Sequence, residues 1–231
     1  MHSELCALGA ALVQESGLRL RLPHAAVAAG MVLFQRAATR MDVCVEWDVR
    51  LVAATCLFVA AKAEEAPARG LRDYLAVFHH AIEGPARPLS IGTQEYFEWK
   101  RTIVALEGVL LRNLGFRVDV DLPHKYLVQY AHGVLECPVP VVQRAWNYCN
   151  DVLRTSACVR FPAEVLASAA IYLAARDLAH ALPDDLAWWQ VFDADLDDIL
   201  AVVAALRALY ALGPPVLPRG YAPSNYVLRG D

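Results

Sequence analysis

The sequence predicts an all-α fold made of two tandem bundles of five helices each. Apolar residues recur at i, i+3, i+4 and i+7 along most of the chain, and no segment shows the alternation typical of a strand. Proline and glycine residues divide this pattern into helix-length segments. Two stretches in different halves of the chain also have similar sequences, which indicates an internal duplication.

The first set of five helices is expected in the N-terminal half of the chain. Pro23 lies in the first turn of the second helix, where a missing N–H costs nothing. The third helix is apolar nearly all round over 51–61, so we expect other helices to surround it. Gly17 and Gly115 are the expected ends of the first and fifth helices. The expected ranges are about 3–14, 23–39, 47–64, 71–82 and 93–113.

The second set of five helices follows a short linker near 117–122. Its expected ranges are about 123–135, 138–155, 162–180, 184–192 and 195–212. The sequence LVAATCLFVAAK at 51–62 is similar to VLASAAIYLAAR at 165–176, an offset of 165 − 51 = 114 residues. The same offset aligns the apolar stripes of two further helices: Val27, Met31 and Phe34 with Val141, Ala145 and Tyr148. One offset for two segments favours duplication over chance similarity.

Composition and charge exclude several classes of function. The net charge of −4 gives no basic surface for direct nucleic-acid binding and no polybasic patch for anionic lipid. Mean hydropathy is +0.33, but the longest apolar run, 51–61, ends at Lys62 and is too short to span a membrane. The first residues, 1–4, form no basic region of a signal peptide, and Glu15 interrupts the apolar residues that follow. The six cysteines form no C-x-x-C pair, so we expect buried thiols in a reducing compartment: Cys6, Cys44, Cys56, Cys137, Cys149 and Cys158.

Several motifs resemble those of cyclins. LFVAAKAEE at 57–65 resembles the cyclin-box signature, and ALEGVLLRNLGF at 105–116 resembles the fifth helix of the same box. GLRLRLPHAAVAAGMVLFQR at 17–36 is similar to the second-helix region of cyclins L, K and T. The remaining segments resemble cyclin L in particular: EEAPARGLRDYLAVFHH at 64–80, LPHKYLVQYAHGVLEC at 122–137, AWNYCNDVLRT at 145–155 and VRFPAEVLASAAIYLAAR at 159–176.

The resemblance to cyclin L implies an all-α fold of two tandem five-helix cyclin boxes. We expect an N-terminal cyclin box at 1–118, a C-terminal cyclin box at 119–213 and a short tail at 214–231. It further implies a nuclear regulatory subunit, not an enzyme, that binds and activates a cyclin-dependent kinase linked to transcription and pre-mRNA splicing. The implied partner is a kinase of the PITSLRE type. No cofactor, metal, membrane or direct nucleic-acid contact is expected, and nothing in the sequence indicates a homo-oligomer.

Three alternatives remain at this point. The chain could be a transcription elongation cyclin similar to cyclins K and T. It could be a general transcription factor similar to TFIIB, which also has a duplicated helical box, but that function calls for a basic face and a zinc ribbon. It could also be a metalloprotein using His79, His80 and Glu83, although no third ligand at suitable spacing is evident.

Lys62 and Glu107 are the candidate kinase-binding residues. Lys62 ends an apolar helix, so its stem can cover apolar surface while its ammonium reaches outward. It could instead satisfy carbonyl groups at the helix C-terminus. Glu107 lies among apolar residues of the fifth helix, where desolvation favours pairing, although it could simply reach water. The resemblance implies that both contact the kinase. Four apolar residues nearby are candidates for either core or interface: Phe58, Leu71, Phe78 and Leu114.

Overall fold

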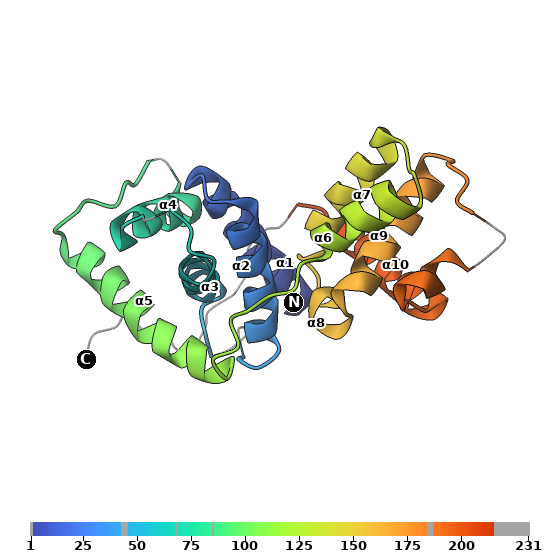
Figure 1. The fold of residues 1–231 in the computed structure, drawn as a ribbon. Helices are drawn as coiled ribbons and strands as arrows, with labels where there is room; N and C mark the ends of the chain where they lie inside the picture. The colour runs from blue at the N-terminus through green and yellow to red at the C-terminus, as the bar shows by residue number, and fades with distance from the viewer. Residues whose placement is uncertain (1, 43–45, 68, 85, 184–186, 215–231) are drawn as a thin grey trace. The chain divides into compact units, whose positions relative to one another are not determined.

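The computed structural model describes residues 2–42, 46–67, 69–84, 86–183 and 187–214 of the 231-residue chain. Regular structure in these residues is helical, with no extended strand (Figure 1). The predicted all-α fold is therefore confirmed. The chain divides into two compact units, one ending at Val120 and the other running from Asp121 to Gly213.

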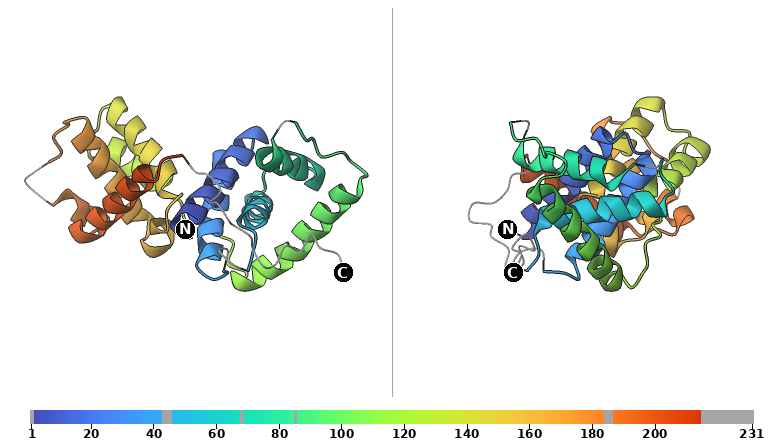
Figure 2. Two further views of the ribbon diagram at one scale, coloured as in Figure 1. Left: turned by 180° about the vertical axis from the view of Figure 1, so that it is seen from behind. Right: turned by 90° about the vertical axis from the view of Figure 1, so that its left-hand side faces the viewer.

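The first unit is a bundle of five helices around α3. The helices are α1 (His2–Arg19), α2 (His24–Ala38), α3 (Val49–Ala63), α4 (Leu71–Glu83) and α5 (Gln94–Asn113). Each of the other four helices packs against α3, as the apolar character of 51–61 predicted. The left view in Figure 2 shows α3 nearly end-on, with α2, α4 and α5 arranged around it. Helices α2 to α5 lie within about two residues of their predicted ranges.

The predicted end of the first helix was wrong. Helix α1 continues through Gly17 to Arg19 instead of stopping near residue 14. A Cβ atom at Gly17 would overlap with the side chain of Val27, and one at Gly9 would overlap with the ring of Phe34. These two glycines let α1 approach α2 closely, so Gly17 serves helix packing and does not end the helix.

The second unit is less regular than the first. Its elements are α6 (Pro123–Val128), the π-helical turn η1 (Gln129–Val134), α7 (Val139–Val152), α8 (Ala157–Arg160), α9 (Ala163–Asp177), the 3₁₀-helix η2 (Trp188–Phe192) and α10 (Leu196–Ala211). The predicted helix at 123–135 is divided between α6 and η1, and α8 was not predicted. Of the predicted helix at 184–192, residues 184–186 lie outside the described residues, and Trp188–Phe192 form the 3₁₀-helix η2.

The central helices of the two units, α3 and α9, match closely. Adding 114 to the bounds of α3 gives the bounds of α9. The same shift carries each of the buried residues of α3 onto a buried residue of α9, without exception. Both helices are followed by a left-handed residue, Glu65 with φ 48° and Ala179 with φ 49°. In each case the next N–H donates to the carbonyl group five residues earlier, at 2.9 and 2.8 Å.

The sequence predicted that no segment spans a membrane and that the cysteines are buried thiols. No described helix is long and apolar enough to cross a membrane. Of the cysteines, Cys44 lies outside the described residues, and the other five are free thiols, four of them buried. Burial raises the pKa of the Cys56 and Cys149 thiols. These two residues therefore behave as small apolar core residues, as predicted.

Candidate functional site

Side-chain caps fix the residues at which α3 and α5 begin. At the start of α3, the carboxylate of Asp48 accepts a hydrogen bond from the backbone N–H of Arg50 at 2.8 Å. The same carboxylate forms an ion pair with the Arg50 guanidinium at 2.6 Å. At the start of α5, the hydroxyl of Thr93 accepts from the N–H of Tyr96 at 3.2 Å. These caps start the two helices that carry Lys62 and Glu107.

The structure brings Lys62 and Glu107 together although 45 residues separate them. The Lys62 ammonium donates a hydrogen bond to Glu107 Oε1 and forms an ion pair with it. The Lys62 side chain is 53% exposed and the Glu107 side chain 19% exposed, so the pair is accessible from solvent. The ammonium also lies 4.7 Å from the centre of the Phe58 ring, one turn earlier on α3. Lys62 is thus held by both a carboxylate and an aromatic face.

The other interpretation of Lys62, as a cap for the end of α3, is not supported by its contacts. The carbonyl groups of residues 60, 61 and 62 accept hydrogen bonds from the backbone N–H groups of residues 64, 66 and 65, respectively. The helix end is therefore satisfied by the backbone, and the ammonium turns toward α5 instead.

The four apolar residues that the sequence left undecided separate into two groups. Phe78 and Leu114 are each 1% exposed and belong to the core. Phe58 and Leu71 are partly exposed at the edge of that core. The Phe58 ring meets Tyr74 edge-on, with ring centres 5.2 Å apart. Burial raises the pKa of the Tyr74 hydroxyl, and nearby Arg69 opposes this to a smaller extent. Phe58 therefore links the charged pair to a rigid aromatic core.

The exposed face of α5 also carries apolar side chains that the sequence reasoning did not single out. Phe97 is 48% exposed and Val104 is 53% exposed. Lys100 and Arg101 flank them around a shallow, open hollow on the same face. Phe97 and Val104 lie seven residues apart, a spacing that marks one helix face, but sequence alone did not say that this face points to solvent.

His79 is buried and held by neighbouring side chains of the first unit. Its ring is fully buried, and Nε2 lies 3.3 Å from Glu95 Oε1. The ring also meets Trp99 edge-on at 5.6 Å. Within the described parts of the chain, no group of three or more His, Cys, Asp or Glu side chains could hold a metal ion. Nothing in the described residues therefore supports the metalloprotein alternative.

Comparison with known families defines the class of protein. Residues 10–119 match the family described as the cyclin N-terminal domain, a range that includes Lys62, Glu107 and most of the first five-helix unit. The match and the five-helix arrangement together place this chain among the cyclins.

Similarity to individual proteins identifies the branch of the cyclins to which this chain belongs. The chain is 39% identical to Cyclin-L1-1 of Arabidopsis thaliana over 88% of its length and 49% of that protein. It is 41% identical to Cyclin-L1 of Danio rerio over 93% of its length and 43% of that protein. For Cyclin-L1 of Homo sapiens the identity is 40%, covering 93% and 41%. The chain belongs to the cyclin L family and spans less than half the length of these relatives.

Solved structures with the same fold are more distant in sequence. A chain of the yeast RNA Pol II CTD kinase CTDK-1 complex superposes with a TM-score of 0.74 at 15% identity, covering 96% of this chain and 72% of that one. A chain of the CAK complex of Chaetomium thermophilum gives a TM-score of 0.64 at 21% identity, covering 91% and 63%. At these identities the similarity shows the fold alone.

Proposed function

We propose that this chain is a cyclin L-like regulatory subunit that binds and activates a cyclin-dependent kinase linked to transcription and pre-mRNA splicing. The observation that carries the proposal is the accessible Lys62–Glu107 pair, held over Phe58 on the first unit of a cyclin L family chain. We propose Lys62 and Glu107 as the kinase-binding residues.

The geometry of the pair suits a contact that holds one kinase element in place. A kinase is active only when a lysine of its third strand pairs with a glutamate of its C-helix. A regulatory subunit that binds the inward C-helix more tightly than the outward one increases the active population. Lys62 can donate further hydrogen bonds to a kinase carbonyl group, and Glu107 keeps a second carboxylate oxygen as an acceptor. Because each side chain already holds the other, little conformational entropy remains to be lost on binding.

The proposed partner is a kinase of the PITSLRE type, and the proposed location is the nucleus. The family relationship to cyclin L supports both. A role in transcription elongation, as in cyclins K and T, is the second candidate, and the resemblance of residues 17–36 to those cyclins supports it. We further propose cyclin boxes at 1–118 and 119–213 followed by a tail at 214–231. The boundary between the two compact units, which follows Val120, supports the first of these divisions.

The test measures binding of the full chain to a PITSLRE-type kinase domain and the activity of the resulting complex. Lys62→Ala and Glu107→Ala are each expected to weaken binding by about 10- to 100-fold, because truncating one member of a charge pair desolvated on binding leaves the other unpaired. Arg207→Ala and Asp197→Ala remove the same charges from exposed positions of α10 and serve as matched controls. Unchanged binding and activity in both site variants would contradict the proposed site.

A second measurement separates the two candidate functions. Affinity purification of the chain from its native cells, followed by mass spectrometry, identifies the bound kinase directly. Recovery of a PITSLRE-type kinase supports the splicing-linked function. Recovery of an elongation kinase in its place would favour the second candidate while leaving the kinase-binding role of Lys62 and Glu107 intact.

A further inference from the structure

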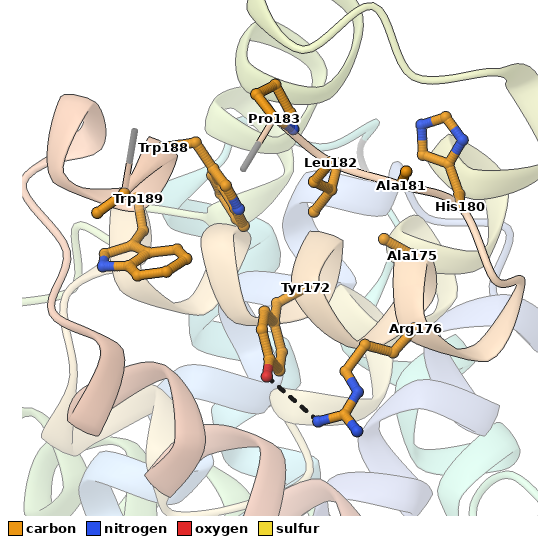
Figure 3. Close-up of a pocket in the computed structure, with 10 residues that line it drawn as sticks. Tyr172, Ala175, Arg176, His180, Ala181, Leu182, Pro183, Trp188 and Trp189 are labelled. Carbon is orange, nitrogen blue, oxygen red and sulfur yellow. Dashed lines mark hydrogen bonds between the residues drawn. The ribbon is translucent and has the colours of Figure 1, made fainter. Parts of the chain in front are cut away.

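The second unit has an aromatic pocket beside the end of α9 that the kinase-binding proposal does not use. Its volume is about 530 Å³. Figure 3 shows Leu182 and Trp188 extending toward α9, and Tyr172 and Arg176 extending from α9 away from Leu182 and Pro183, with Trp189 to the left of Tyr172. Trp188 is 5% exposed and fixes this wall in the core. A pocket of this size, with aromatic walls and polar groups on Tyr172, Arg176 and His180, can take a ligand or peptide side chains.

The pocket lies where the charged pair lies in the first unit. Under the 114-residue offset, Arg176 corresponds to Lys62 and Tyr172 to Phe58. The contacts correspond as well, since the Arg176 guanidinium lies 5.7 Å from the centre of the Tyr172 ring. Arg176 also donates a hydrogen bond to the Tyr172 hydroxyl at 3.2 Å, drawn as the dashed line in Figure 3. Both units therefore place a cation over an aromatic ring at the end of the central helix.

The two units differ in what the cation meets. Lys62 pairs with Glu107, whereas Arg176 forms no ion pair with any described carboxylate, and its hydrogen bond goes to Tyr172. The neighbouring Asp177 is already engaged, because it accepts a hydrogen bond from the Tyr148 hydroxyl. The described lining of the pocket contains no acidic side chain. The starts of the fifth helices α5 and α10 are 196 − 94 = 102 residues apart, so the α10 position that corresponds to Glu107 is 107 + 102 = 209, an apolar residue, Leu209.

We propose that this pocket binds a segment of a protein partner in which an acidic side chain stands next to an aromatic residue or a proline. The partner carboxylate takes the place beside Arg176 that Glu107 takes beside Lys62, and the guanidinium offers it a planar fork of N–H donors. The adjacent apolar side chain packs against the partly exposed ring of Trp189. The second unit would then recruit a partner other than the kinase held by the first unit.

The experiment selects peptides with the full chain. A phage-displayed library of random linear peptides is panned on the immobilised chain, with Arg176→Gln as the counter-selection target. The expected peptides carry Asp or Glu close to Trp, Phe or Pro. The most enriched peptide is then synthesised with its acidic residue intact, with that residue changed to the amide, and with phosphoserine in its place. The affinity of each form is measured for the wild-type chain and the variants.

Arg176→Gln and the acid-to-amide change in the peptide are each expected to weaken binding by at least about tenfold, with little further loss when they are combined. Trp189→Ala is expected to weaken it to a similar extent. Arg207→Gln and Val191→Ala, exposed in the same unit, are the controls and should leave affinity unchanged. Failure to enrich acidic peptides, equal losses from Arg176→Gln and Arg207→Gln, or a strong preference for the phosphoserine form would each overturn the proposal.

Discussion

The ends of α3 and α9 are built alike but carry different surroundings. Their buried positions coincide, and a residue in the left-handed conformation follows each helix at the same position. The central helix and its C-terminal cap are therefore alike in the two units. The following segments differ, since α5 starts 94 − 63 = 31 residues after α3, whereas α10 starts 196 − 177 = 19 residues after α9. The packing of the central helix is therefore the same in both units, whereas the fifth helix differs. The fifth helix of the first unit supplies a carboxylate to the cation at the end of the central helix.

The largest expected effect tests whether the two cores are equivalent. Leu57 and Ile171 are corresponding residues, and both are 0% exposed. Leu57→Ala and Ile171→Ala should each reduce the free energy of unfolding of their own unit by about 2–5 kcal/mol, because each leaves a cavity in a closely packed helix. Hydrogen–deuterium exchange measured by mass spectrometry should show faster exchange in the affected unit. Markedly unequal losses of unfolding free energy would show that Leu57 and Ile171 are packed differently although both are fully buried.

An intermediate effect tests the shared helix end. Glu65 and Ala179 occupy left-handed backbone conformations that cost about 1 kcal/mol for residues other than glycine. Glu65→Gly and Ala179→Gly should therefore each stabilise the chain by about 0.5–1 kcal/mol, net of the greater freedom of glycine in the unfolded state. Urea denaturation measures the change. Glycine at partly exposed Glu98, inside α5, is the control and should destabilise the chain instead.

The smallest expected effect concerns the two cations themselves. Lys62→Ala removes an ion pair that is about half exposed, so solvent screening limits the expected loss of unfolding free energy to about 1 kcal/mol or less. Arg176→Ala removes only the contacts with Tyr172 and should cost about 0.5 kcal/mol. Chemical denaturation of the two variants checks the order. A larger loss for Arg176→Ala would mean that the guanidinium has a stabilising partner within the chain.

The helices that could be predicted from sequence are those whose ends follow local rules. Helix α2 begins after Pro23, α4 lies between Gly70 and Gly84, and α5 begins after Thr93. Apolar spacing defines the inner faces of helices α2 to α5. Gly17 misled the prediction because its role depends on Val27, a residue of the next helix. The turn η1 also escaped prediction. Its hydrogen bonds join residues five apart instead of four, such as Leu135 N to Tyr130 O at 2.8 Å. The spacing of apolar residues in this turn still resembles that of an α-helix.

Residue spacing alone predicted Lys62 and Glu107 as two separate residues, and only the resemblance to cyclins implied that they form a pair. The sequence placed Lys62 at a helix end and Glu107 on an apolar stripe, and each had a second interpretation. Their contact depends on how α3 and α5 cross, which spacing along the chain does not determine. The place of Phe58 beneath the ammonium, in contrast, follows from the i, i+4 spacing of Phe58 and Lys62 on α3. The pocket of the second unit depends on the path of the chain after α9, so no local sequence pattern predicted it.

The buried cysteines give each unit its own chemical reporter. A thiol reacts as the thiolate, and burial suppresses that form at Cys56 in the first unit and at Cys149 in the second. Both sulfurs are therefore shielded from alkylation and peroxide while their helices stay packed. Modification of one but not the other would mark which half of the molecule opened first, without any label being introduced.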